Sequence, residues 1–312
     1  MKQNKILITG GTGFIGYHLA KKCLKLNWSV DSISTNLPKK IRKLKKVKYI
    51  KLDISKKLKI KKKLLSNYDY VVNLAGYVDH SNKNKTLRSH FNGCKNIAEF
   101  FLNSKIKRFI QVGSCIEYGK IKSPQKENEV KFSKTYSYYG KAKSLSTKFL
   151  LSLHRKFNFP STILRLYLVY GPKQDLNRII PITIDNAIKN KEFDCSPGNQ
   201  LRDFIYVDDL IEAIIKVLKN KNVSGQIINI GSGNPISIKK VVLKICKLTG
   251  GGNPKFGKIY FRNDEILKLY PDISKAKKLL KWQPKVSFNR GILKTIKVFK
   301  KLCRVLNICV PK

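Results

Sequence analysis

The fold of this chain is decided by its first element, residues 5–16, which read K-I-L-I-T-G-G-T-G-F-I-G. Ile6, Leu7 and Ile8 form an apolar run that is too short for a helix and is soon followed by glycine, so we expect a buried parallel strand. An amphipathic helical pattern from Phe14 to Leu26 comes next. The chain therefore opens with a strand, a glycine-rich turn and a helix, in that order.

The turn carries glycines at the spacing that dinucleotide-binding proteins use. Gly11, Gly13 and Gly16 fit G-x-G-x-x-G, and Gly10 with Gly13 and Gly16 puts glycine at every third position. Such glycines give a tight turn, let the backbone approach a pyrophosphate, and let the helix pack closely with its first amides toward the phosphates. We predict a dinucleotide site formed by Gly10, Gly11, Gly13, Phe14, Ile15 and Gly16. The alternative is a purely structural turn in a flavodoxin-like domain.

Apolar and amphipathic segments alternate along the rest of the chain. We expect further strands at 28–34, 48–52, 70–75, 109–113, 161–166 and 226–230, and helices at 14–26, 87–104 and 140–157. This alternation predicts an α/β fold with a doubly wound parallel sheet of the Rossmann type. Shorter, turn-rich segments after 166 predict a smaller, interleaved C-terminal region. We therefore assign 1–166 and 205–232 to the dinucleotide-binding domain, and 167–204 and 233–312 to a substrate-binding region.

Composition sets limits on the class of protein. A chain of 312 residues can bury a full core, and no apolar run approaches the roughly 18 to 20 residues that span a bilayer. No signal peptide precedes the first strand, so we expect a cytoplasmic protein without membrane insertion. The seven cysteines form no C-x-x-C pair and the four histidines show no ligand spacing, which predicts reduced thiols and no metal site.

The formal net charge of +46 is unusual. Ten of the 65 basic residues are arginine, which leaves 55 lysines, most densely placed between Lys39 and Lys63. A basic stripe there could hold nucleic acid or an anionic membrane surface. We favour a lysine-biased composition on solvated helix faces and expect no specific nucleic-acid partner. A non-catalytic polyanion- or RNA-binding protein with the same fold is the alternative from another functional class.

The end of the second strand bears on the choice of cofactor. An NAD enzyme usually has an acid about 20 residues beyond the glycines, and a carboxylate there repels the 2′-phosphate of NADP. Ser34 occupies this place, with Lys39, Lys40 and Arg42 close behind, which modestly favours NADP over NAD. Asp31 is the other candidate acid, but it falls inside the strand.

Three residues have the chemistry of a proton-transfer site. Tyr139 and Lys143 share one helical face, so the ammonium can lower the phenol's pKa toward a value useful for proton transfer. Chance alone predicts about two or three tyrosines placed four residues before a lysine, and Tyr17 and Tyr118 also have this spacing. Only Tyr139 begins the helix after the fifth strand, which Ser114 closes. We therefore predict Ser114, Tyr139 and Lys143 as the catalytic set, with Ser114 binding a substrate oxygen; an ordinary turn residue is the alternative for Ser114.

The ordered motifs of the chain resemble those of the extended short-chain dehydrogenase/reductases of the NAD-dependent epimerase/dehydratase family, which act on nucleotide sugars. They are I-T-G-G-T-G-F-I-G at 8–16, L-D-I at 52–54, N-L-A-G at 73–76, V-G-S-C-I-E-Y-G at 112–119, Y-G-K-A-K at 139–143, L-R-L-Y-L-V-Y-G-P at 164–172, R-D-F-I-Y-V-D-D-L at 202–210, N-I-G-S-G at 229–233 and P-D-I-S-K-A-K-K-L-L-K-W at 271–282. The resemblance covers nearly the whole length.

The resemblance implies roles for particular residues. Lys143 would also hold the nicotinamide ribose, and Arg202 and Arg262 would clamp the phosphates of a nucleotide sugar, a role that suits the planar guanidinium. Further cofactor contacts would come from Asp53, Ile54, Leu74 and Ala75; a plain strand-end cap is the alternative for Asp53. Relatives pair the helices 87–104 and 140–157 with their copies, which implies a homodimer; the alternative is that the C-terminal region covers these apolar faces within the monomer.

Departures from the family pattern narrow the reaction. Leu168 and His90 each stand where many relatives have asparagine, and Cys115 and Ile116 replace the acidic pair with which 4,6-dehydratases eliminate water. A dehydratase is therefore not favoured, and we expect Cys115 to be a packed side chain rather than an acid. The resemblance implies a 4-keto sugar reductase or a 4-epimerase that moves a hydride between NADP or NAD and the sugar's C4, in the synthesis of sugar precursors for surface polysaccharide.

Overall fold

A computed structural model of the chain describes residues 3–56, 67–77, 79, 81–129, 137–261 and 265–306. Its centre is a seven-stranded sheet with the order β10-β6-β5-β4-β1-β2-β3, in which every neighbouring pair is parallel. The strands are β1 (Lys5–Thr9), β2 (Ser29–Ser34), β3 (Val47–Lys51), β4 (Tyr70–Asn73), β5 (Arg108–Ser114), β6 (Ser161–Leu166) and β10 (Gln226–Ile230). The predicted doubly wound parallel sheet is confirmed, and each predicted strand differs from its observed bounds by at most two residues.

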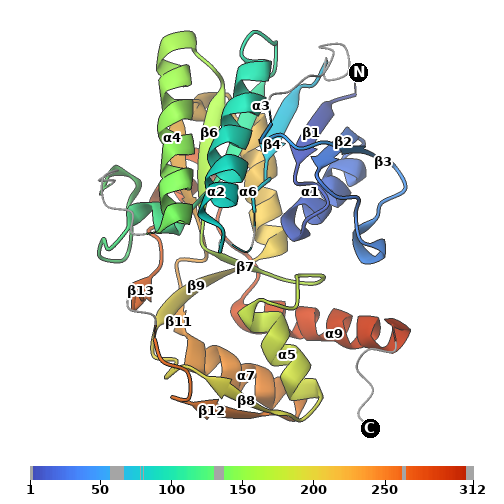
Figure 1. Ribbon diagram of the computed structural model, residues 1–312, viewed down its shortest axis with the longest axis vertical. Coiled ribbons are helices and arrows are strands. Elements are labelled where there is room, and N and C mark those ends of the chain that lie inside the picture. The colour runs from blue at the N-terminus through green and yellow to red at the C-terminus, as the bar shows by residue number, and fades with distance from the viewer. Residues whose placement is uncertain are drawn as a thin grey trace.

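Helices cover both faces of this sheet (Figure 1). Along one face run α1 (Phe14–Lys25) and α6 (Val207–Lys219). Along the other run α2 (Lys83–Leu87), a π-helical turn η3 (Arg88–Asn92), α3 (Gly93–Phe101) and α4 (Tyr138–Phe157). The single helix predicted at 87–104 is thus three consecutive segments that begin at Lys83. Its first turn was missed because K-N-K-T has no apolar side chain with which to mark a buried face.

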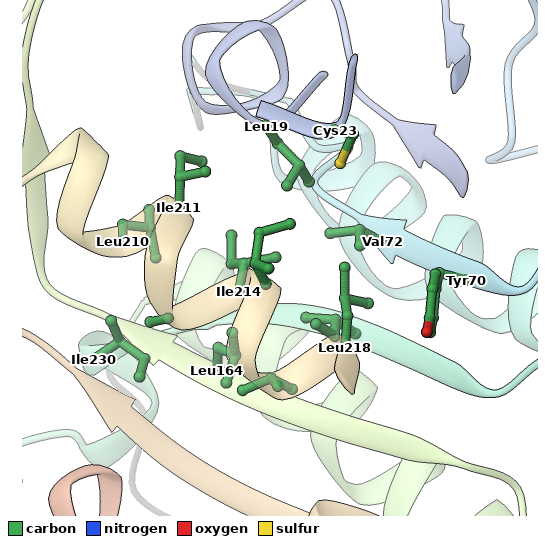
Figure 2. Packing of buried hydrophobic residues seen from close by; sticks show 14 of the residues in the cluster. Leu19, Cys23, Tyr70, Val72, Leu164, Leu210, Ile211, Ile214, Leu218 and Ile230 are labelled. Atoms are coloured by element: carbon green, nitrogen blue, oxygen red, sulfur yellow. The ribbon is translucent and has the colours of Figure 1, made fainter. Parts of the chain in front are cut away.

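The core lies between the sheet and these two helix layers. Along β1, Ile6 and Ile8 face the α1 and α6 layer while Leu7 faces the α3 and α4 layer, as expected when successive strand side chains alternate between faces. Figure 2 shows the first of these layers, where side chains of α6 lie close to those of α1, β4, β6 and β10: Leu19, Cys23, Tyr70, Val72, Leu164, Leu210, Ile211, Ile214, Leu218 and Ile230. The central strands β1 and β4 are therefore apolar on both faces because both are buried, whereas the edge strand β3 has exposed lysines.

A smaller region of short strands and helices lies beyond the carboxyl ends of the sheet (Figure 1). One small sheet joins β9 (Leu201–Tyr206) to β7 (Leu168–Tyr170), β11 (Pro235–Ser237) and β13 (Lys268–Leu269), and another pairs β8 (Glu192–Cys195) with β12 (Asn253–Phe256). Three helices, α5 (Ile179–Ile188), α7 (Ile238–Thr249) and α9 (Phe288–Leu306), contribute to a separate apolar cluster here.

The predicted domain division stays a prediction, and one helix departs from it. The helix α8 (Ser274–Leu280) falls within the range 233–312 that was assigned to the substrate-binding region. However, Ala276, Leu280 and Trp282 pack into the cluster that α6 forms with the large sheet. The indole of Trp282 also donates a hydrogen bond to the carbonyl of Asp209 at 3.2 Å. The chain therefore returns to the first domain once more before α9.

Two further sequence-based expectations can be compared with the structure. Cys23, Cys94, Cys115, Cys195 and Cys246 are free thiols, but Cys303 is disulfide-bonded, so the prediction of reduced thiols is wrong for that residue. The reason is that cysteine spacing in the sequence does not report which sulfur atoms lie within bonding distance. Within the described ranges, no helix is long and apolar enough to cross a membrane.

Candidate active site

The glycine turn is packed so closely that its glycines leave no room for side chains. Gly10 has a φ of 72°, and its amide donates to the Ile33 carbonyl at 2.7 Å, which ties the turn to β2. A Cβ on Gly16 would lie 2.5 Å from the Gly10 carbonyl oxygen, and one on Gly10 would lie 2.9 Å from the Ala75 nitrogen. Side chains at these positions would push the backbone apart. Because Gly13 caps α1 without any side-chain hydrogen bond, the first amides of the helix are left for an anion.

The other predicted cofactor residues surround this turn. The amide of Thr12 lies 3.5 Å from the Ser34 hydroxyl, so Ser34 stands at the end of β2 beside the glycines. Leu74 donates its amide to the Thr9 carbonyl at 3.0 Å, which places the residues after β4 next to the same turn. Asp53 accepts a hydrogen bond from the Ser55 amide at 2.9 Å, as the strand-end cap alternative requires. Ile54 is buried directly after it.

The basic residues behind Ser34 are held by the smaller region. Arg42 is buried, donates to the Lys173 carbonyl and pairs with Asp175 at 3.0 Å. Lys39 lies 3.7 Å from the same carboxylate. Asp31, the alternative acid, is buried inside β2 and accepts a hydrogen bond from the Tyr68 hydroxyl at 2.5 Å. Neither Arg42 nor Asp31 is therefore placed to contact a cofactor ribose.

The structure brings Ser114, Tyr139 and Lys143 together. Ser114 ends β5, and its hydroxyl caps the short helix η4 (Cys115–Tyr118) that follows. Tyr139 lies in the first turn of α4, which the Ser137 side chain caps, and its phenol is hydrogen-bonded to Ser114. Lys143 follows one turn later, with its amine 5.8 Å from the centre of the Tyr139 ring. All three are at the carboxyl edge of the sheet, where open α/β sheets bind their ligands.

Burial dominates the electrostatics of this trio. It raises the pKa of Tyr139 to about 12, opposed by the hydrogen bond from Ser114. It lowers the pKa of Lys143 to about 8, opposed by the negative charge of Glu117. The expectation that the ammonium lowers the phenol's pKa is therefore wrong for the structure as it stands. The physical reason is that the Lys143 amine donates to the Val112 carbonyl at 2.7 Å. Burial therefore destabilises the ionised form of the Tyr139 phenol by more than its neighbours stabilise it.

The two other tyrosines with the same spacing lie in different surroundings. The Tyr17 hydroxyl accepts a hydrogen bond from the Lys173 amine at 2.8 Å. Tyr118 is buried, and its hydroxyl donates to the Asn229 side chain at 2.8 Å. Neither hydroxyl is bonded to Ser114. Of the three tyrosines that lie four residues before a lysine, only Tyr139, at the start of the helix after β5, is therefore bonded to Ser114.

The residues at the family's substrate positions are arranged around this trio. Arg202, on β9, is close enough to Cys115 for their charges to interact and is ion-paired with Glu265. His90 is buried, with its ring 5.0 Å from that of Tyr139. Burial raises the pKa of Cys115 to about 12, in agreement with a packed thiol rather than an acid. Arg262, the second predicted phosphate contact, lies outside the described residues.

Three charged residues of the site were missed from the sequence. Arg178, at the start of α5, is exposed and near enough to Tyr139 to affect its pKa. Glu117 and Arg165 form a buried ion pair directly behind Ser114. The sequence does carry a signal for this pair: a glutamate lies within S-C-I-E-Y-G and an arginine within the apolar strand segment L-R-L. Because a charge is rarely buried without a partner, these two residues could have been predicted to pair.

Comparison with known proteins agrees with this geometry. The chain belongs to the NAD dependent epimerase/dehydratase family, whose family model matches residues 6–231. It is 30% identical to a UDP-N-acetyl-alpha-D-glucosaminuronate decarboxylase of Bacillus cytotoxicus, across 96% of this chain and 99% of that protein. It is also 30% identical to a putative UDP-glucose 4-epimerase of Methanocaldococcus jannaschii, across 95% of this chain and 98% of that protein.

A solved structure extends the comparison to the fold. The UDP-glucuronic acid 4-epimerase of Bacillus cereus, in complex with UDP-glucuronic acid and NAD, superposes with a TM-score of 0.87 at 27% identity, covering 96% of this chain and 99% of that one. The resemblance read from the motifs is therefore confirmed. The protein is an enzyme of the extended short-chain dehydrogenase/reductase type, in a family of nucleotide-sugar epimerases, dehydratases and decarboxylases that use NAD.

Proposed function

We propose that this enzyme moves a hydride between NAD(P) and C4 of a nucleotide sugar, as a 4-epimerase or a 4-keto sugar reductase. The observation that carries the proposal is the hydrogen bond between Tyr139 and Ser114 at the carboxyl edge of the sheet. A sugar oxygen that replaces either partner would meet both a proton donor and a second hydrogen-bonding hydroxyl. Such a pair serves oxidation of a C4 hydroxyl and reduction of a C4 carbonyl equally well.

Each residue then has a separate task. When bound at the glycine turn, the nicotinamide cofactor supplies the hydride acceptor and donor. Tyr139 takes the proton from the C4 hydroxyl or returns it to the carbonyl oxygen, and Ser114 holds that oxygen by a hydrogen bond. Lys143 binds the nicotinamide ribose and, as an ammonium, stabilises the phenolate that forms when Tyr139 gives up its proton. Arg202, with Arg262, binds the phosphates of the nucleotide.

Elimination of water is not part of this proposal. That reaction needs an acid near the sugar's C5 and C6, and Cys115 and Ile116 stand at the two positions where relatives carry one. The pKa of the Cys115 thiol, raised to about 12 by burial, keeps it protonated and weakly acidic. Loss of carbon dioxide stays compatible with this site, because oxidising C4 of a sugar acid places a ketone β to its carboxylate. A decarboxylation product is therefore one outcome that the test must be able to detect.

The proposal also covers the cofactor and the oligomeric state. Ser34, not an acid, ends β2 beside the glycine turn, so we propose that NADP is accepted with a modest preference over NAD. Phe91 on η3, Phe100 on α3 and Phe149 on α4 are only half-buried, and Phe91 packs edge-to-face on Phe149. A second copy of the chain that docks these helices would cover that apolar surface, so we propose a homodimer.

A panel experiment tests the function directly. The purified enzyme is incubated with NAD or NADPH and with UDP-, dTDP-, GDP- and CDP-sugars, including 4-keto forms and sugar acids, and the products are identified by mass spectrometry and NMR. Inversion at C4 identifies an epimerase, and consumption of a 4-keto sugar with NADPH identifies a reductase. No turnover of any nucleotide sugar, together with submicromolar selective binding of RNA, would replace the proposal by the polyanion-binding alternative.

A further inference from the structure

Glu117 and Arg165 form an ion pair with no exposure to solvent, directly behind Ser114. Glu117 lies in η4 and Arg165 near the end of β6, and the guanidinium Nη2 is 3.0 Å and the Nε 3.2 Å from the carboxylate Oε2. The guanidinium also stacks over the Tyr118 ring, 4.3 Å from its centre. Taking two charges out of water costs about as much as their attraction returns, so stability alone is a weak reason for such a pair.

The remaining bonds of Glu117 connect two parts of the proposed catalytic site. Its Oε1 accepts the Ser114 amide at 2.8 Å, and its Oε2 accepts the Thr147 hydroxyl at 2.7 Å. Thr147 lies eight residues after Tyr139 and four after Lys143, which puts all three on one face of α4. One carboxylate therefore bonds both the loop that carries Ser114 and the helix face that carries Tyr139 and Lys143.

The neighbouring backbone is shaped to admit this carboxylate. A Cβ on Gly113 would lie 2.4 Å from the Glu117 Oε1, so any side chain at that position would displace it. The Glu117 side chain also completes a capping box with Ser114 at the start of η4. The hydrogen bond from the Ser114 amide to Glu117 thus fixes the Ser114 backbone and closes the first turn of η4 at the same time.

The charge of Glu117 reaches both titrating groups of the trio. It raises the pKa of Lys143 against the effect of burial, and it raises the pKa of Tyr139. The other groups that act on Tyr139 and Lys143 are the Ser114 hydroxyl, the buried thiols of Cys115 and Cys94, and the guanidinium of Arg178. Arg165 faces Glu117 from β6 and balances its charge.

We propose that Glu117 is a positioning residue, which fixes Ser114 relative to the Tyr139 and Lys143 face of α4 and supplies the negative charge that keeps Lys143 an ammonium. Arg165 pairs with the Glu117 carboxylate and balances its charge in this buried place. The inference rests on the proposed function, because it assigns Glu117 a task in the same proton transfer. It concerns a residue that touches neither substrate nor cofactor.

The variant Glu117→Gln tests the proposal because glutamine keeps an acceptor for the Ser114 amide but removes the charge. We expect kcat to fall about 10- to 100-fold with the KM for the nucleotide sugar within about twofold, as when a catalytic group is slightly misplaced. We also expect the alkaline limb of the kcat–pH profile to move to lower pH by about one unit. The reason is that loss of the negative charge of Glu117 lowers the pKa of Lys143 and the pKa of Tyr139.

A matched control separates positioning from a general loss of stability. Asp209 is also a buried carboxylate, but it lies on α6, across the sheet from α4, and accepts the amides of Lys285 and Val286 at 3.1 and 3.0 Å. Asp209→Asn should lower the unfolding temperature and leave the alkaline limb in place. If Glu117→Gln and Asp209→Asn change kcat equally and neither moves the limb, the proposal is overturned.

Two further arms keep the test decisive. If Glu117→Gln fails to fold because Arg165 is left unpaired, the double variant with Arg165→Met removes both charges and should fold with the same shifted alkaline limb; a wild-type limb in that variant overturns the proposal.

If the wild type turns over no nucleotide sugar, the proposed function fails. The rate at which the buried Cys115 thiol is alkylated then tests only whether Glu117 anchors the loop after Ser114. The folded Glu117→Gln or double variant should be alkylated at least about tenfold faster. An unchanged rate contradicts the anchoring.

Discussion

Replacing Lys143 by methionine is expected to make the fold more stable at pH 7 while it abolishes turnover. The side chain is only 4% exposed, and its amine donates to the Val112 carbonyl at 2.7 Å. Burial lowers its pKa from 10.5 to about 8. At pH 7 the folded protein therefore holds an ammonium in a place that favours the neutral amine, and methionine fills similar volume without that cost.

The size of the effect follows from the two pKa values. A fall from 10.5 to about 8 corresponds to a cost of about 3 kcal/mol at pH 7. Losing the hydrogen bond to Val112 subtracts about 1 kcal/mol, which leaves a net gain of about 2 kcal/mol for the variant. Because the folded-state pKa is below the unfolded-state value, the cost is present in full below about pH 8 and disappears as the pH rises toward 10.5. The advantage of the variant should thus be close to zero at about pH 9.5.

Urea unfolding of the wild type and of Lys143→Met at pH 7 and pH 9.5 measures this difference. Lys141→Met is the matched control, because Lys141 is exposed on the same helix and should change the unfolding free energy by less than about 0.5 kcal/mol at either pH. A variant that is less stable than the wild type at pH 7, or a difference that does not change with pH, would refute the assignment of Lys143 as a buried ammonium.

Three other predictions concern the cofactor, the assembly and the charge. Ser34→Asp should shift the preference from NADP toward NAD by charge repulsion, measured by fluorescence titration; wild type that binds NAD at least about tenfold tighter than NADP would contradict the proposed preference. Light scattering at micromolar concentration should give the mass of a dimer, and a monomer mass would reject the helix pairing. RNA and DNA should bind more weakly than micromolar at about 0.15 M salt and should not compete with nucleotide sugar, whereas tight, structure-selective binding would favour the polyanion alternative.

Much of the fold could be predicted because its signals are local. The apolar run Ile6–Ile8 and the glycines after it fix a strand, a turn and a helix within about 20 residues, and the central strands β1 and β4 are buried on both faces and therefore apolar in sequence. The place of Ser34 at the end of β2 could be predicted from its distance in sequence from the glycines. These features depend on backbone geometry and burial, which neighbouring residues in the sequence already determine.

What could not be predicted depends on contacts between distant segments. Arg42 was expected near the cofactor, but Lys173 and Asp175, more than 130 residues away, hold it instead. Glu117 and Arg165 are 48 residues apart, and neither spacing nor composition reports that they meet. The pKa of Tyr139 was misjudged for the same reason, since the helical spacing shows that Lys143 is near but not that its amine bonds to Val112.

The central claim is that Tyr139, positioned by Ser114, carries the proton in a reaction at the sugar's C4. The most direct test compares the wild type, Tyr139→Phe and Tyr118→Phe on whichever nucleotide sugar of the panel is turned over, with cofactor binding and the unfolding temperature measured alongside. Tyr139→Phe should lose about 10²- to 10⁴-fold in kcat while it still folds and binds cofactor, and Tyr118→Phe should lose far less. Wild-type turnover by Tyr139→Phe would contradict the account.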